Sequence, residues 1–363
     1  MTLQGGASIL DDVAAMGRAD TEGMLGYLEG FADQVAGGWR IARELELPWE
    51  TPRSVALLGM GGSAIGGDIV KSVWADRISA PVAVLRDYEL PAWVGSDTLV
   101  IASSKSGDTE ETLRQLESAL QRRCPVICVS SGGALRRVAE AAKLPLVTFP
   151  AEGSPRASVG WSLGIVAGIL ERAGVLELED AEVERAVTSA REMAARCAPG
   201  VVTADNPAKR LAWSLVDRFV VITGSGFLAP VARRWKTQLN ENSKAAAVFE
   251  ELPEATHNTV VGLEQPDSLR DHLAVVSLRS QLDHPRNALR AQLMDDVMDT
   301  GLVWHASVET SGDGRLGHAL SAIVMGDYVS VYTAFMYAVD PTPIAVIDHI
   351  KEQLRLADQV APE

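Results

Sequence analysis

The chain reads LLGMGGSAIGGD over residues 57–68 and SSKSGDTEET over residues 103–112. Each stretch follows a short apolar run, which predicts a strand, and opens a segment that predicts a helix. The first turn of a helix leaves backbone N–H groups unpaired, and its aligned peptide dipoles favour an anion. One glycine-rich turn can also serve packing, but two that carry hydroxyls predict a single phosphate site. The hydroxyls belong to Ser63, Ser104, Ser106 and Thr109.

Strand-like and helix-like segments alternate through the first half of the chain. The patterns predict strands at residues 55–58, 82–85, 98–102, 126–129 and 146–149, and helices from residues 64, 109, 133 and 159. This alternation with short loops indicates parallel strands joined by right-handed crossovers. In such a sheet a ligand binds at the carboxyl ends of the strands, where both glycine- and serine-rich loops lie.

The second half of the chain restarts the same pattern. The run Phe219–Phe227 resembles Val55–Ser63, which indicates a weak internal repeat of a whole domain. Further strands are predicted near residues 273–278 and 303–308, with closing helices near 316–339 and 343–356. We therefore expect about two amphipathic N-terminal helices in residues 1–47, a first α/β domain at 48–198, a second at 199–340 and a C-terminal helix at 341–363.

Composition limits the class of protein. The 363 residues carry 33 basic and 48 acidic side chains, a net charge of -15, which disfavours nucleic acid and anionic membranes as partners. No apolar run is expected to approach the length of a membrane span and no signal peptide is evident, so we expect a soluble, cytoplasmic protein. The cysteines at 124, 128 and 197 are expected to be buried thiols in a reducing compartment. The six histidines show no metal-ligand spacing, so no metal is expected.

A family resemblance rests on motifs spread over nearly the whole chain. These are GMGGS at 59–63, SKSGDTE at 104–110, NENSK at 240–244, HN at 257–258, and GDYVS at 326–330 followed by DPTP at 340–343. In this order they resemble the bifunctional phosphoglucose/phosphomannose isomerase family. The resemblance implies an α/β fold of two sugar isomerase (SIS) domains, each a doubly wound, mostly parallel sheet flanked by helices. It implies no cofactor.

The resemblance also assigns roles to residues. It places the sugar phosphate on Ser63, Ser104, Ser106 and Thr109, in agreement with the argument from helix ends, and lets the backbone at Gly61 and Gly62 approach the sugar. Arg156 matches the family's active-site arginine, and a fixed cation is what a transient enediolate needs. A surface-loop arginine is the alternative at this position.

Isomerisation of an aldose to a ketose needs a base that moves a proton from C2 to C1 through a cis-enediol. Glu241 matches the family's base, a task that a carboxylate can perform. His257 matches the histidine that opens the sugar ring, which in this family comes from the partner subunit of a homodimer. Lys351 matches a late active-site lysine, although a solvated helix-face lysine is the alternative. Glucose 6-phosphate and/or mannose 6-phosphate are the implied aldoses, with fructose 6-phosphate as the ketose.

Three positions depart from the family pattern and two other functions stay open. Lys105 stands where an aromatic is usual, Asp108 where Asn is usual, and Ile344 near a threonine linked to mannose phosphate acceptance. We expect Asp108 to point away from the phosphate or to cap the helix from 109, with Lys105 offsetting its charge. A non-catalytic sugar-phosphate sensor would not need Glu241 or His257. An NAD enzyme would use Gly59-x-Gly61-x-x-Ala64 with Asp87 on the ribose.

Overall fold

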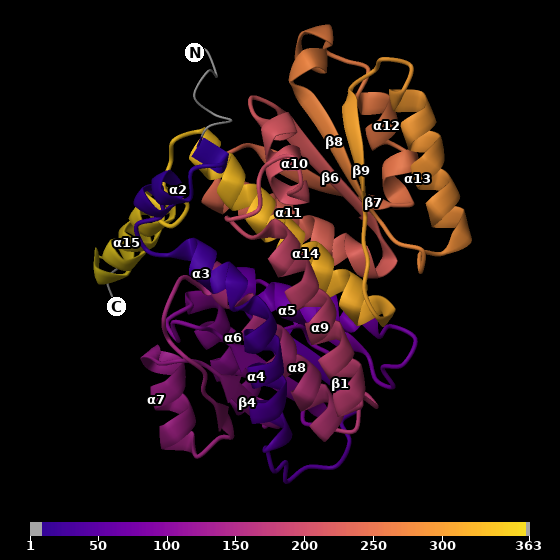
Figure 1. Cartoon of the computed structure of the whole chain (residues 1–363). Helices are drawn as coiled ribbons and strands as arrows, with labels where there is room; N and C mark the ends of the chain where they lie inside the picture. The colour runs from indigo at the N-terminus through magenta and orange to yellow at the C-terminus, as the bar shows by residue number, and fades with distance from the viewer. Residues whose placement is uncertain (1–8, 361–363) are drawn as a thin grey trace.

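The computed structural model describes residues 9–360 and consists of two parallel β-sheets with a layer of helices between them (Figure 1). The first sheet has the order β2-β1-β3-β4-β5 and the second β7-β6-β8-β9, and every strand pair is parallel. The predicted α/β class with parallel sheets flanked by helices is therefore confirmed.

The first sheet follows the sequence pattern closely. Its strands are β1 Ser54–Leu58, β2 Val82–Leu85, β3 Thr98–Ser103, β4 Val126–Val129 and β5 Leu146–Val147. Its helices are α5 Gly61–Val73, α6 Glu110–Gln121, α7 Gly133–Ala142, η1 Pro155–Ser158 and α8 Val159–Arg172. All residues of β3 and β4 are buried, because helices cover both faces of the sheet. β1 and β3 are direct neighbours, with Leu58 opposite Ala102, so the loops after them lie side by side at the carboxyl edge.

The second sheet contains one strand that the sequence pattern missed. Its strands are β6 Phe219–Ser225, β7 Ala247–Leu252, β8 Leu273–Arg279 and β9 Trp304–Glu309. Its other elements are α10 Pro207–Leu215, η2 Gly226–Leu228, α11 Ala229–Asn242, η3 Glu254–Thr256, α12 Thr259–Gly262, η4 Asp267–His272 and α13 Pro285–Met298. β7 is an edge strand whose middle residues are at most half-buried, and its Ala and Glu residues have low strand propensity.

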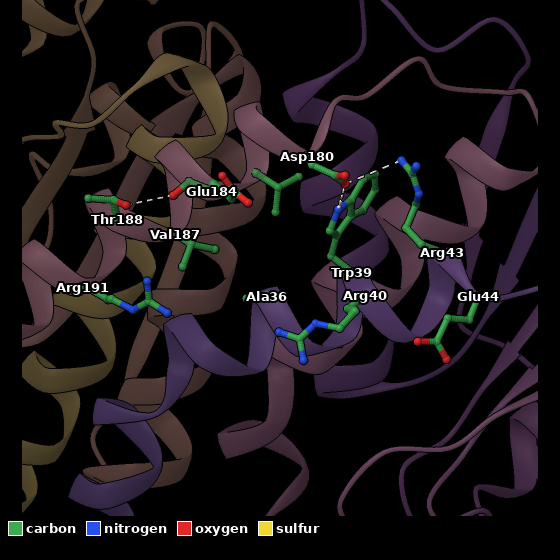
Figure 2. Close-up of a pocket in the computed structure, with 11 residues that line it drawn as sticks. Ala36, Trp39, Arg40, Arg43, Glu44, Asp180, Glu184, Val187, Thr188 and Arg191 are labelled. Carbon is green, nitrogen blue, oxygen red and sulfur yellow. Dashed lines mark hydrogen bonds and ion pairs between the residues drawn. The ribbon is translucent and has the colours of Figure 1, made fainter.

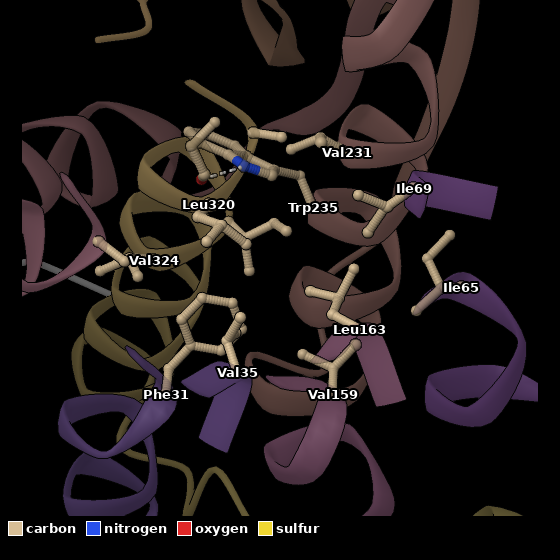
Figure 3. Close-up of a cluster of buried hydrophobic side chains, with 14 of the residues drawn as sticks. Phe31, Val35, Ile65, Ile69, Val159, Leu163, Val231, Trp235, Leu320 and Val324 are labelled. Carbon is tan, nitrogen blue, oxygen red and sulfur yellow. Dashed lines mark hydrogen bonds between the residues drawn. The ribbon is translucent and has the colours of Figure 1, made fainter. Parts of the chain in front are cut away.

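Helices from both halves of the chain form one shared core. The N-terminal segment folds into α2 Val13–Ala19, α3 Met24–Glu29 and α4 Phe31–Arg43, rather than into two helices, and α4 packs along α8. α9 Asp180–Cys197 packs against α4 and α14 Gly314–Met336. Figure 3 shows apolar side chains of α4, α5, α8, α11 and α14 meeting in this core. The domain boundaries given above stay a prediction.

Helix α14 is the one described helix that is long and apolar enough to cross a membrane, and 94% of its apolar window is buried inside the protein. The expectation that no apolar run approaches this length was therefore wrong. The helix is this apolar because it passes through the centre of the molecule, where protein and not water surrounds it. The chain ends in α15 Ala345–Val360, in which residues 345–357 are exposed. The three cysteines are free and buried, as expected.

Candidate active site

Two helix N-termini meet at the carboxyl edge of the first sheet. α5 begins after Met60 and α6 after Thr109, and neither first turn receives a side-chain cap. Gly61 adopts a left-handed φ of 50°, which turns the chain sharply from β1 into α5. Backbone N–H groups of both first turns can therefore bind an external anion, supported by two helix dipoles.

The four predicted phosphate hydroxyls lie on these two helix starts. Ser104 is buried, and its Oγ lies 2.7 Å from Thr109 Oγ1, so the two hydroxyls are hydrogen-bonded to each other. Ser106 is exposed, and its Oγ accepts the Asp108 N–H at 3.3 Å. Ser63 is half-buried in the first turn of α5 on the neighbouring loop.

The charged side chains of the second loop turn away from this anion site. Asp108 Oδ1 accepts the Ala134 N–H at 2.9 Å, so its carboxylate caps α7 and not the helix from 109. Lys105 extends to the backbone carbonyls of Glu152 and Gly153. The expectation that Lys105 offsets the charge of Asp108 is therefore wrong, because each side chain has a separate partner.

Arg156 is buried, with 4% of its surface exposed, which excludes the surface-loop alternative. It lies on η1, where its Nε donates to Asn242 Oδ1 at 2.6 Å. Its Nη2 donates to the carbonyls of Pro341 at 2.8 Å and Thr342 at 2.6 Å. Its Nη1 is also buried but has no hydrogen-bond partner within residues 9–360. Burial lowers the pKa of Arg156, an effect that the Glu241 carboxylate opposes.

Glu241 brings the second half of the chain to this site. It lies in the last turn of α11, and its Oε2 is 3.5 Å from Arg156 Nη1. The carboxylate is 28% exposed, so a small molecule can reach it. The start of α5 lies against the same group, because a Cβ built on Gly62 would be 2.7 Å from the Pro155 carbonyl oxygen. A partly exposed carboxylate thus faces a guanidinium N–H group without a partner, beside the two helix N-termini.

His257 is not brought to this group, and no described contact joins Lys351 to it. α11 runs back from the carboxyl end of β6, so Glu241 lies at the amino edge of the second sheet. β7 then spans its six residues, on the order of 20 Å, before the chain reaches His257 at the opposite edge. His257 is exposed after η3, and Lys351 is exposed on α15.

A hollow of about 800 Å³ lies elsewhere, between α4 and α9 (Figure 2). Two of its three arginines have acidic neighbours: Arg43 lies 3.7 Å from Asp180, and Arg191 lies 2.6 Å from Asp33. None of the sequence-predicted site residues lines it. Three arginines and three carboxylates line it, and this balanced charge makes it a poor phosphate site.

Contacts that sequence reasoning missed hold Arg156 in place. Arg234 is buried and donates to the Arg156 carbonyl at 3.0 Å and to Asp327 at 2.6 Å. Lys244 is exposed, and its Nζ donates to the carbonyls of Asp340 and Pro341, beside the Arg156 guanidinium. Asn242, Lys244 and Asp327 belong to the NENSK and GDYVS motifs. Their presence in these motifs was the sequence signal that could have linked them to the site.

Comparison with known proteins gives matches over most of the chain. A model of the bacterial phospho-glucose isomerase C-terminal SIS domain matches residues 204–354. A bifunctional phosphoglucose/phosphomannose isomerase of Caldicellulosiruptor bescii is 38% identical over 83% of this chain and 89% of its own. The protein of that name from Aquifex aeolicus is 33% identical over 90% of this chain and 97% of its own.

Solved structures agree on the fold. A hypothetical protein from Thermus thermophilus superposes with a TM-score of 0.76 at 16% identity, covering 98% of this chain and 96% of its own. Tagatose-6-phosphate ketose/aldose isomerase from Escherichia coli superposes with a TM-score of 0.63 at 17% identity, covering 89% of this chain and 95% of its own.

Proposed function

The chain belongs to the bifunctional phosphoglucose/phosphomannose isomerase family, and we propose that it interconverts glucose 6-phosphate, mannose 6-phosphate or both with fructose 6-phosphate. The chain covers 89% and 97% of two relatives that carry this name, so the likeness is not confined to one domain. We also propose a cytoplasmic location, which suits an enzyme of phosphorylated sugars.

The observation that carries the proposal is the pair formed by Arg156 Nη1 and Glu241 Oε2. Three of the arginine's contacts go to protein oxygens, and the remaining buried nitrogen has no hydrogen-bond partner among the described residues and faces the carboxylate. A sugar oxygen bound between them would satisfy that nitrogen. The same nitrogen would then stabilise the negative oxygen of an enediolate in a water-poor setting.

In this proposal Glu241 is the base. Its carboxylate takes the proton from C2 of the open-chain aldose while the C1 carbonyl oxygen becomes an enediol oxygen. The protonated Glu241 then delivers a proton to C1, while the proton of the C2 hydroxyl moves to the oxygen at C1 and a carbonyl forms at C2. No net oxidation occurs, so the chemistry needs only a base, a fixed cation and a way to hold the substrate.

The phosphate is proposed to bind at the starts of α5 and α6, on Ser63, Ser104, Ser106 and Thr109, with backbone donors at Gly61 and Gly62. Ser104 and Thr109 already present a pair of hydroxyls there. Two uncapped helix ends suit a dianion better than the balanced hollow between α4 and α9.

Ring opening is proposed to use His257 from a second copy of the chain. Within one chain Glu241 and His257 lie at opposite edges of the second sheet. The face around His257 also leaves apolar side chains uncovered: Val261 is 64% exposed and Leu293, on α13, is 53% exposed. α13 is tied to the His257 loop by a hydrogen bond from Arg290 to Thr256. Lys351 on α15 stays a candidate for the same site.

The test incubates purified protein separately with glucose 6-phosphate and mannose 6-phosphate and measures fructose 6-phosphate. The same reactions in D₂O measure deuterium at C1 or C2, because a proton relayed by Glu241 can exchange with solvent, whereas a direct hydride shift cannot. We expect turnover of at least one substrate with solvent deuterium in the product. Binding without turnover would indicate a sugar-phosphate sensor and overturn the proposal.

A further inference from the structure

A buried lysine joins the phosphate-type loop to the loop that carries Arg156. Lys105 lies between Ser104 and Ser106, and only 7% of its surface is exposed. Its Nζ donates to the Glu152 carbonyl at 2.6 Å and also to the Gly153 carbonyl. These are charge-assisted bonds, which are stronger than bonds between neutral groups.

Lys105 is one of the residues that hold the loop at residues 150–154 in place. Residues 150–153 are exposed, and the loop leads directly into Pro155 and Arg156 of η1. Its other face rests on Tyr27, since a Cβ on Gly153 would lie 2.7 Å from that ring. Ser131 makes a second link between the two loops, because the Lys105 carbonyl accepts its N–H at 3.1 Å and its Oγ donates to the Phe149 carbonyl at 2.9 Å and the Pro150 carbonyl at 3.4 Å.

We propose that Lys105 is a positioning residue that fastens the loop at 150–154 to the phosphate-type loop and thereby holds the Arg156 guanidinium beside Glu241. The inference rests on the proposed isomerase function and adds a residue to it. The ammonium reaches backbone oxygens and not the anion site, so it acts through Arg156. Misplacing a group that contacts the reacting atoms lowers turnover more than it lowers phosphate affinity.

The charge of Lys105 gives the proposal a second measurable property. Burial lowers the pKa of Lys105 to about 8, an effect that the Glu152 carboxylate opposes. The group is therefore charged below about pH 8 and neutral above it. A neutral amine keeps two N–H groups but loses the charge-assisted component, so the loop is held less firmly as pH rises through this value.

The chain offers a matched control in Lys209. It is also buried, and its Nζ donates to the carbonyls of Pro199 at 2.8 Å and Val201 at 2.7 Å, away from the Arg156 group. Lys209→Met removes the same kind of contact without touching the site. It should lower stability while leaving the kcat of the folded protein unchanged.

The experiment compares wild type, Lys105→Met, Lys105→Arg and Lys209→Met in isomerase kinetics. Lys105→Met should lose roughly 10- to 100-fold in kcat, with affinity for inorganic phosphate within about twofold of wild type. Lys105→Arg should recover most of that loss. Hydrogen exchange at residues 150–155 should speed up in Lys105→Met and stay unchanged in Lys209→Met.

The pH profile supplies the last comparison. Wild-type kcat should fall above about pH 8, and Lys105→Arg, which stays charged, should lack that fall. Wild-type kcat and wild-type exchange rates in Lys105→Met would overturn the positioning role while leaving the isomerase function intact. An inactive wild type would instead refute the proposed function, and the exchange rates would still test whether Lys105 holds the loop.

Discussion

At the scale of residues, contacts to both the side chain and the backbone hold Arg156 in place. Asn242 and the carbonyls of Pro341 and Thr342 use its Nε and Nη2, and Arg234 holds its backbone carbonyl. A side chain fixed at so many points loses little conformational entropy when a substrate binds its remaining nitrogen. Preorganisation of this kind is what electrostatic stabilisation of an enediolate requires.

Glu241→Gln tests the proposed base directly. Glutamine has nearly the same shape but cannot accept and return a proton, so kcat should fall by at least ~10²-fold while phosphate affinity stays within a few-fold. Steady-state kinetics and competition by inorganic phosphate measure the two effects. Glu192→Gln, an exposed change on α9, is the control and should behave as wild type. Near-normal turnover in folded Glu241→Gln protein would place the base elsewhere.

The sequence could indicate which residues belong to the site but not how they are held. Ser104 and Thr109 lie in one loop, so local pattern alone placed their hydroxyls together. Arg156 meets Asn242 and Pro341 across 86 and 185 residues of chain, contacts that no local pattern encodes. The direction of Lys105 was likewise unpredictable, because its partners are backbone carbonyls, which carry no residue signature.

At the scale of elements, apolar runs located the first sheet to within a few residues, because strands buried on both faces are continuously hydrophobic. The sequence pattern missed edge strand β7, because its middle residues are only partly buried and so do not form a continuous apolar run. The starts of α5 and α6 are left uncapped, whereas Asn206 caps α10 with two hydrogen bonds. Helices such as α4, α8 and α11 also start without a side-chain cap, so a missing cap alone does not mark a substrate site. The starts of α5 and α6 differ in carrying hydroxyls at the same carboxyl edge of the first sheet.

One buried ion pair joins the helices that support the site. Arg234 of α11 and Asp327 of α14 are 1% and 2% exposed, with Nη2 and Oδ2 at 2.6 Å. Arg234→Met should destabilise the protein by about 3–5 kcal/mol, because it leaves Asp327 charged or protonated without its partner in the core. Urea denaturation monitored by circular dichroism measures this loss.

The double variant Arg234→Met/Asp327→Leu separates folding from function. Replacing both charges with apolar groups should restore much of the stability, since a buried ion pair gives little net stabilisation. It should not restore kcat, because the hydrogen bond to the Arg156 carbonyl is still missing. Recovery of full turnover in the double variant would show that the Arg234 hydrogen bond to the Arg156 carbonyl has no part in positioning Arg156.

At the scale of the whole molecule, the internal repeat creates a second site-like position that differs in charge. After β6, Gly226 has a φ of 52°, close to that of Gly61, and a hollow of about 500 Å³ opens beside it. There Asp283 accepts Ser225 Oγ–H at 3.1 Å and the Ser280 N–H at 2.9 Å. A carboxylate thus occupies donors that could otherwise bind a phosphate, which explains why one half alone carries the proposed anion site.

The final prediction follows from the opposite placement of Glu241 and His257 in one chain. If His257 serves the partner's site, mixing inactive Glu241→Gln and His257→Ala chains should restore activity, because each mixed dimer holds one site with both wild-type residues. Random exchange makes half the dimers mixed, so about a quarter of wild-type activity should return. Native mass measurement confirms the exchange, and isomerase assays measure the recovery. No recovery despite complete exchange would mean that both residues serve a site within one chain, and β7 would then have to move relative to α11.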